Sequence, residues 1–310
     1  MERIFTSLIK SLPLAMLLIF LSNYGMSQKL YNKRYVNKPS GNYKKKAKNS
    51  MAEGTAFVSW GYNRTAYTKS NINFVGTGYN FTLRGVKAVD RPSLKLSEYV
   101  SPDKITVPQF NFRIGYNFAN YWNLSIGFDH LKYVMVHGQE YLLDGKINSG
   151  VDANWSGSYA DEIVKTEETK FHYENTNGQN YIRAEITRVR NLVRNNRDNF
   201  TLSGLLGAST GVILSFNDFT FGGEKDVQTV SLSGLGLSAH GGLRFEFFKH
   251  FFLQTNVSLG ILAQNHVKTR PADYSAYARQ TFGYVEGNVV MGALFYIRPT
   301  NSCGSCPAWD

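Results

Sequence analysis

Three residues in one short stretch have the side chains of a hydrolytic centre. Ser238 and His240 are two positions apart in a segment that alternates between apolar and polar residues, and Glu246 falls on the same side of that alternation. A serine nucleophile, a histidine base and an orienting carboxylate are the groups that acyl transfer uses. This triad is a weak alternative, because such sets arise often by chance and all three side chains are predicted to face the interior.

Other reactive side chains lack the partners that a metal or cofactor site needs. Cys303 and Cys306 form a C-x-x-C that follows a predicted strand near the end of the chain. A local disulfide fits an exported protein better than thiol redox chemistry, and a metal would need further ligands. His130 and His137 are seven positions apart, on opposite faces of a regular strand. No nucleotide, zinc or calcium motif is present, so no metal and no cofactor is expected.

Charged residues occur at positions whose neighbours in the alternation are large and apolar. Three are arginines and four are acids, so their charges nearly cancel, and buried charges must be paired. We expect a charge network inside the fold, with a proton or ion pathway as the alternative if the interior is wider. The predicted members are Arg113, Asp129, Arg183, Glu185, Arg244, Glu246 and Glu286.

The segment "VPQFNFRIGYNFANYWNLSIGFDH", 107–130, shows which elements position these groups. Phe110, Phe112 and Ile114 alternate with polar or small residues, and the pattern resumes after a break at 119–121. A period of two predicts β-strands. The large aromatic residues share one face and the small polar residues share the other, over arms of about ten residues. This is the pattern of a transmembrane β-barrel, in which lipid-facing and lumen-facing residues alternate.

Six further segments alternate in the same way, at 54–64, 180–189, 200–216, 231–248, 252–264 and 282–297. The connections between the segments alternate between long and short. The long ones are 65–105, 136–179, 217–229 and 265–281, and the short ones are 119–121, 190–199 and 249–250. An all-β, antiparallel, up-and-down transmembrane barrel of about eight strands follows, with short periplasmic turns and long outer loops. Segments 71–85 and 169–178 also look extended; they are expected to prolong strands above the membrane, or to raise the strand number to ten or twelve.

The termini predict export. Residues 1–27 have a short basic start, an apolar core and small residues before Gln28, as a cleaved signal peptide does. A single membrane helix is the alternative, but the apolar run is shorter than the ~20 residues that a span needs. The chain carries a net charge of +11, and residues 28–50 contain eight Lys and Arg and no acid. We expect a disordered periplasmic leader at 28–50, a barrel at 51–298 and a periplasmic C-terminal tail at 299–310. The leader is either simply solvated or contacts an acidic partner such as lipid phosphates.

These features resemble the small Gram-negative outer-membrane β-barrel proteins, the group that includes OmpW- and OmpX-like barrels. The resemblance is carried by the signal peptide, "FNFRIGYNFANYWNLSIGFDH", "LRFEFFKHFFLQTNVSLG" and "VVMGALFYI", and it covers roughly residues 54–297. It implies a place in the outer membrane, contact with lipopolysaccharide and no catalytic motif. Lipid A deacylase barrels use a His-x-Ser pair with a Glu, whereas the order here is Ser-x-His.

Function is expected in the outer loops, where binding residues gather when a scaffold is rigid. Residues 65–106 are rich in Tyr, Phe and Asn, and residues 137–179 contain Trp155, Tyr159 and several acids. The expected role is non-enzymatic binding of a membrane or extracellular partner, with support of envelope integrity and no nucleic acid. A lipid A-modifying enzyme and a narrow small-solute pore are the alternatives.

Overall fold

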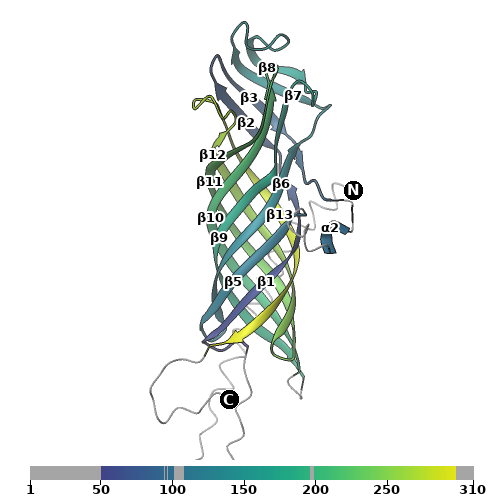
Figure 1. Ribbon diagram of the computed structural model, residues 1–310, viewed down its shortest axis with the longest axis vertical. Coiled ribbons are helices and arrows are strands. Elements are labelled where there is room, and N and C mark those ends of the chain that lie inside the picture. The colour runs from purple at the N-terminus through teal and green to yellow at the C-terminus, as the bar shows by residue number, and fades with distance from the viewer. Residues whose placement is uncertain (1–49, 94, 96, 101–107, 196–198, 298–310) are drawn as a thin grey trace, which may run out of the picture. The chain divides into compact units, whose positions relative to one another are not determined.

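Eight antiparallel strands form a closed ring (Figure 1). The computed structural model describes residues 50–93, 95, 97–100, 108–195 and 199–297. The ring order is β1-β5-β6-β9-β10-β11-β12-β13, and it closes because β1 pairs with β13 from Thr55↔Tyr296 to Tyr67↔Tyr284. Its strands are β1 (Thr55–Tyr67), β5 (Phe110–Ala119), β6 (Trp122–Met135), β9 (His172–Arg194), β10 (Phe200–Phe221), β11 (Glu224–Phe247), β12 (Phe251–Lys268) and β13 (Tyr277–Tyr296). The prediction of an antiparallel barrel of about eight strands is confirmed.

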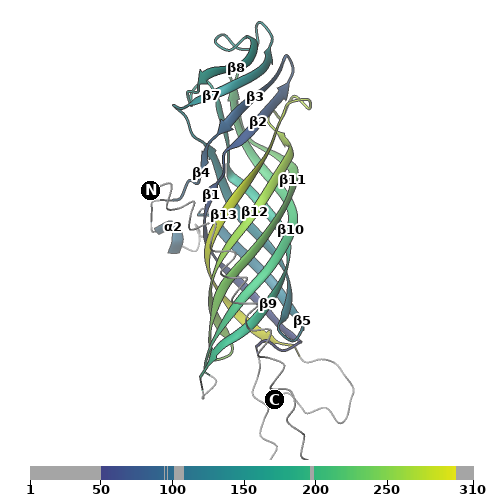
Figure 2. The ribbon, with the colours of Figure 1, turned by 180° about the vertical axis from the view of Figure 1, so that it is seen from behind.

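The remaining elements lie mainly at the end of the ring opposite the short turns (Figures 1 and 2). They are β2 (Ser70–Gly76), β3 (Tyr79–Val86), β4 (Ala88–Val89), α2 (Ser97–Val100), β7 (Glu140–Ile147) and β8 (Gly157–Lys165). β2 continues the sheet from the upper part of β13, and β3, β7 and β8 follow in that order. No helix of the described ranges has the length and apolarity needed to cross a bilayer. We call β2, β3, β7 and β8 the apical sheet.

Several strands are longer than the alternation predicted. β10 and β11 continue to Phe221 and from Glu224, so the long connection expected at 217–229 is instead a hairpin that turns at Gly222 and Gly223. Both glycines have positive φ, 64° and 76°, which a two-residue hairpin turn requires and glycine adopts at no steric cost. Of the two segments expected to prolong strands, 169–178 prolongs β9 from His172, whereas 71–85 forms the separate hairpin β2–β3 outside the ring. The ring count stays at eight.

Alternation places the side chains of the ring strands as predicted. On β5, Asn111, Arg113 and Asn117 are buried, whereas Ile114 and Phe118 are exposed. The same pattern runs along β9, where Arg183 and Glu185 are buried. A strand turns successive side chains to opposite faces, so one face of every ring strand fills the interior and the other forms the outer wall.

Residues 1–49 and 298–310 lie outside the described residues. The expected signal peptide, the basic leader up to Asn49 and the Cys303–Cys306 pair therefore stay predictions.

Candidate functional site: the polar interior of the barrel

The interior is divided into three layers, which can be read along two strands. On β9, Tyr181 is followed at alternate positions by Arg183, Glu185, Thr187 and then Val189. On β13 the inward order is Phe282, Tyr284, Glu286, Asn288, Val290 and, closer to the turn, Leu294. Aromatic residues thus occupy the apical part, polar residues the middle and aliphatic residues the part near the short turns.

The apical layer is a large aromatic core, which we call the aromatic cap. Phe74 of β2 and Phe81 of β3 are fully buried, with ring centroids 5.3 Å apart. Phe74 also lies 5.5 Å from Phe219 and 5.4 Å from Tyr173, on the ring strands. The remaining members include Ile72, Tyr79, Leu83, Leu131, Tyr133, Leu143, Phe171, Tyr181, Ile213, Phe221, Leu262, Phe282 and Tyr284.

This cap corrects the expectation for the outer loops. Phe74, Tyr79 and Phe81 belong to segment 65–106, but burial leaves them unable to contact a partner. Trp155 of segment 137–179 packs against Phe171 with centroids 5.1 Å apart, and Tyr159 donates its hydroxyl to the Trp155 carbonyl. Their aromatic content serves packing, because strands that continue beyond the ring need a core of their own.

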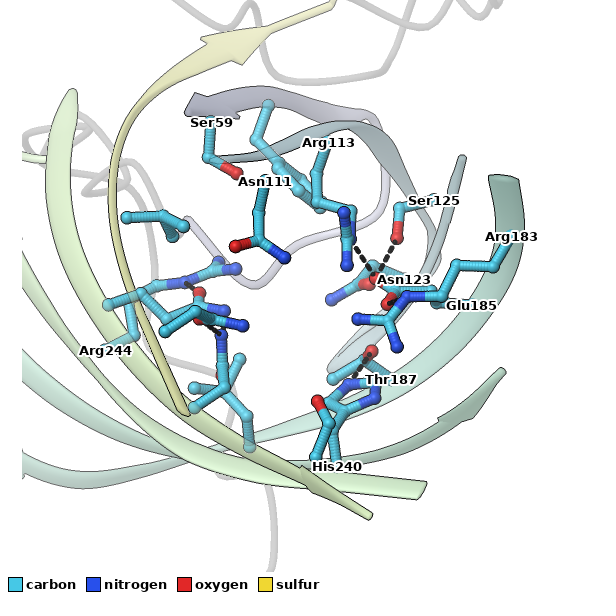
Figure 3. A pocket seen from close by; sticks show the side chains of 17 residues that line it. Ser59, Asn111, Arg113, Asn123, Ser125, Arg183, Glu185, Thr187, His240 and Arg244 are labelled. Carbon is cyan, nitrogen blue, oxygen red and sulfur yellow. Dashed lines mark hydrogen bonds and ion pairs between the residues drawn. The ribbon is translucent and has the colours of Figure 1, made fainter. Parts of the chain in front are cut away.

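Four of the predicted charges form one cluster in the middle layer. Three of them, Arg113, Arg183 and Glu185, are labelled in Figure 3. Arg113 Nη1 lies 2.6 Å from Asp129 Oδ1, and its Nε donates to Glu185 at 2.8 Å. Arg183 Nε lies 2.9 Å from Asp129 and 2.8 Å from Glu185. The register explains the meeting, because Arg113 and Arg183 are both partners of Gly127, on either side of β6. A side chain at Gly127 would collide with the Arg113 guanidinium, so glycine leaves the room that two arginines need.

The remaining predicted charges form no ion pair with this cluster among the described residues, although Asn111 donates to both Asp129 and Glu286. Glu286 accepts hydrogen bonds from Asn111 and Asn288, both at 2.8 Å. Glu246 accepts a hydrogen bond from the Ser50 hydroxyl, close to the short turns. Arg244 forms no ion pair with either of them in the described part of the chain; its Nε donates to Gln254 at 2.7 Å.

A row of side-chain amides connects Arg244 to Glu286. Gln254 accepts from Arg244 and donates to Asn256 at 3.0 Å, Asn256 donates to Asn288 at 2.9 Å, and Asn288 donates to Glu286. Every amide has its oxygen toward the arginine and its nitrogen toward the carboxylate, so the dipoles add along the row. Sequence reasoning placed these amides on the inward face but did not recognise them as a connection, which depends on the register of β11, β12 and β13.

The candidate hydrolytic triad is not assembled. Ser238 Oγ lies 2.6 Å from Ser209 Oγ and accepts from Arg183 at 3.1 Å. His240 Nε2 contacts the Thr187 hydroxyl at 3.0 Å instead of a serine. Glu246 is six positions further along the same strand, which is roughly 20 Å at ~3.3 Å per residue.

The end with the short turns is closed by residues just before β1. Met51 is buried against Val189 and Leu205. Asn117 Nδ2 donates to the Ser50 carbonyl at 2.8 Å, and the Tyr121 backbone N–H donates to the Met51 carbonyl at 2.8 Å. These contacts fix the chain across the mouth of the ring. Phe57, Phe252 and Leu294 form a second apolar cluster beside it.

The two histidines considered for a shared metal have different partners. His130 Nδ1 contacts Asn180 at 2.8 Å, whereas His137 Nε2 contacts His172 Nδ1 at 2.9 Å. His172 in turn lies 3.1 Å from Glu174. Burial, and secondly the charge of His172, lower the pKa of His137 below its usual value. In the described ranges, no group of three or more His, Cys, Asp or Glu is arranged to hold a metal ion.

Solved barrel structures are similar to most of this chain. Ail, the attachment invasion locus protein of Yersinia pestis, is 15% identical; the alignment covers 78% of this chain and 99% of Ail, with a TM-score of 0.30. The outer membrane protein OprG of Pseudomonas aeruginosa is 11% identical over 80% and 99% of the two chains, with a TM-score of 0.35. For the outer membrane protein AlkL the identity is 9%, the coverage 87% and 99%, and the TM-score 0.34.

No protein-family model and no curated protein sequence matches the chain. The barrel architecture rests on the closed ring of eight strands in this chain.

Proposed function

We propose that this protein is a non-enzymatic outer-membrane β-barrel whose apical sheet is a rigid platform for binding outside the cell. The outer wall of the ring carries this proposal. Ile126, Leu237 and Met291 have exposed fractions of 62, 65 and 64%, and they lie on three different ring strands. Other exposed apolar residues of the wall include Phe112, Ile114, Phe118, Leu124, Ile186, Leu206, Leu235, Leu243, Phe247, Leu253, Val257, Leu259, Ile261, Val289 and Phe295.

An apolar wall around a polar interior inverts the arrangement of a water-soluble protein. Monomeric soluble proteins rarely expose apolar patches larger than a few hundred Å². A closed barrel satisfies its backbone hydrogen bonds internally, which is the condition for β-structure to cross hydrocarbon. The exported, signal-peptide-bearing chain predicted from the sequence then belongs in the outer membrane, with lipopolysaccharide as its immediate lipid environment.

The packed interior favours a scaffold over the two alternatives. A pore needs a continuous aqueous path, whereas the aromatic cap fills one part of the lumen and Met51, Val189 and Leu205 fill another. A lipid A-modifying enzyme would need its nucleophile and base together and accessible, whereas Ser238 and His240 are buried and bonded to other residues.

The outward face of the apical sheet carries polar groups held by their neighbours, beside the exposed Leu142 and Ile163. Asn73 donates to Asn80 at 3.0 Å and accepts from Arg279 at 2.9 Å. Arg84 lies 3.1 Å from Asp144 and 2.8 Å from Asp161. Exposed amide and charged groups held by their neighbours suit the recognition of a polar ligand such as a glycan or a peptide, because little side-chain entropy is lost on binding.

Two experiments test the membrane placement and the closed interior. Unheated protein from outer-membrane fractions should migrate faster in gel electrophoresis than heated protein, and a monodisperse aqueous monomer without detergent would refute the placement. Protein reconstituted in planar bilayers should be electrically silent. Regular single-channel steps would favour the pore, and altered lipid A acylation in deletion cells would favour the enzyme.

The binding platform is best tested with surface substitutions rather than with deletions. Removing the β2–β3 hairpin would also remove Phe74 and Phe81 from the aromatic cap, so lost binding would not report on the surface. Asn80→Ala with Arg84→Ala leaves the cap intact. This variant in nanodiscs should lose binding to any glycan or peptide that the natural sequence retains on an array, whereas Arg188→Ala, on the ring wall, should keep it.

A further inference from the structure

The middle layer contains a cavity between the charge cluster and Arg244 (Figure 3). Its volume is about 30 Å³, enough for one or two water-sized species and too small for phosphate with its hydration or for an organic ligand. The charged residues on its wall are Arg113, Arg183, Arg244 and Glu185, which are three cations and one anion. Asp129, behind the wall, also pairs with Arg113 and Arg183, so the cation of the wall that lacks an ion pair is Arg244.

The positive charge is least compensated at Arg244. The residue is 3% exposed, and its guanidinium lies over the rings of Phe252 and Phe57, 4.4 and 5.2 Å from their centroids. Only its Nε has a hydrogen-bond acceptor among the described residues, Gln254. No ion pair of the described chain includes Arg244, although Glu246 is two positions away. Glu246 therefore acts on Arg244 only through space. A buried guanidinium without an ion pair in contact is costly, so a mobile anion would stabilise it.

The wall also offers hydrogen-bond donors without acceptors. Ser258 and Asn123 belong to the wall, and Ser258 Oγ and Asn123 Nδ2 have no hydrogen-bond partner among the described residues. Asn111 Oδ1, an acceptor of a third wall residue, has none either. The carboxylate on the wall is already engaged, because Glu185 accepts from Arg113 and Ser125 and lies 2.8 Å from Arg183. With the carboxylate engaged, the guanidinium of Arg244 and two unpaired donors outnumber the one unpaired amide oxygen, and this balance favours an acceptor carrying negative charge.

We propose that this cavity binds one small inorganic anion of halide size beside Arg244. The Nη groups of Arg244 supply the charge, and hydroxyl and amide donors of the wall complete its surroundings. The amide row to Glu286 contributes to this arrangement, because Gln254 accepts from Nε of Arg244 and leaves its Nη groups for the ion. This inference depends on the packing of the interior and not on what the apical sheet binds.

Bromide is the probe for a direct test, because it replaces chloride and scatters X-rays anomalously. Crystals of the unmodified protein grown with bromide as the only halide should show an anomalous peak within hydrogen-bond distance of Arg244 Nη. Density in the cavity without an anomalous signal would mean water alone and would overturn the proposal. This experiment needs no variant to fold.

The urea unfolding midpoint gives a second, independent test of the anion site. The urea midpoint of the protein in detergent should rise when gluconate, which is too large for the cavity, is replaced by chloride at equal ionic strength. Arg244→Gln should abolish that rise, whereas Arg188→Gln, which removes an equal charge from the exposed outer wall, should retain it. An equal chloride response in all three proteins would attribute the effect to general screening and refute the site.

Discussion

The four-membered charge cluster makes a quantitative prediction about coupling. Arg113→Met removes two ion pairs, of 2.6 and 2.8 Å, and leaves Asp129 and Glu185 to share Arg183 alone. One negative charge is then uncompensated in the buried interior. Removing one partner of a buried ion pair typically costs about 3–5 kcal/mol, and Glu185→Met should cost a similar amount because it leaves a surplus cation.

The double variant distinguishes pairing from packing. Arg113→Met with Glu185→Met leaves Arg183 beside Asp129, which is electrically neutral, and methionine conserves much of the lost volume. Its cost should be well below the sum of the two single costs, with a coupling of roughly 3 kcal/mol. Reversible urea unfolding in lipid vesicles, followed by tryptophan fluorescence, measures all four proteins. Costs that add to within about 0.5 kcal/mol would refute the cluster as an electrostatic unit.

Three further predictions concern other parts of the chain. Gly127→Ala should cost about 1–3 kcal/mol, because the added Cβ would lie 2.6 Å from Arg113 Cζ, whereas Gly287→Ala, with nothing within 4 Å, should be nearly neutral in urea unfolding. Leu237→Arg should destabilise the folded protein in vesicles by about 2–4 kcal/mol, the cost of a cation at mid-bilayer depth; no change would contradict a lipid contact there. Burial and the charge of His172 lower the pKa of His137 in the folded protein, so the unfolded chain binds that proton more tightly. The free energy of unfolding should therefore be highest above the ordinary pKa of 6.5 and should fall as the pH drops below it. Urea midpoints at about pH 7.5 and 5.5 should differ less in His137→Asn, and an unchanged difference would assign the dependence to other groups.

The inward or outward direction of each side chain was predictable from the sequence because a strand has a strict period of two. Arg113, Arg183 and Arg244 were expected in the interior on that basis, and they are buried there. Which charges meet was not predictable, because this depends on the stagger between strands. Arg113 and Arg183 meet through their common neighbour Gly127, while Arg244 and Glu246 share a strand face and form no ion pair.

The alternation pattern also did not predict how far the strands extend. The gap between two alternating segments predicted a long connection at 217–229, yet the two consecutive glycines, Gly222 and Gly223, are the signal of a two-residue hairpin. Aromatic residues such as Phe74 and Phe81 were ambiguous, because exposed binding residues and core residues have the same composition. Only the packing of the β2–β3 hairpin against β9 and β10 identifies them as core.

The central claim is that the outer wall of the ring contacts hydrocarbon while equally exposed residues of the apical sheet contact water. Leu237 and Ile163 are the matched pair, with exposed fractions of 65% and 68% on β11 and β8. A nitroxide label at each position, in protein reconstituted in lipid vesicles, can be probed with oxygen and with a water-soluble nickel chelate. The label at Leu237 should be accessible to oxygen and protected from the chelate, and the label at Ile163 should behave in the opposite way. Equal access of the chelate to both labels would contradict the account.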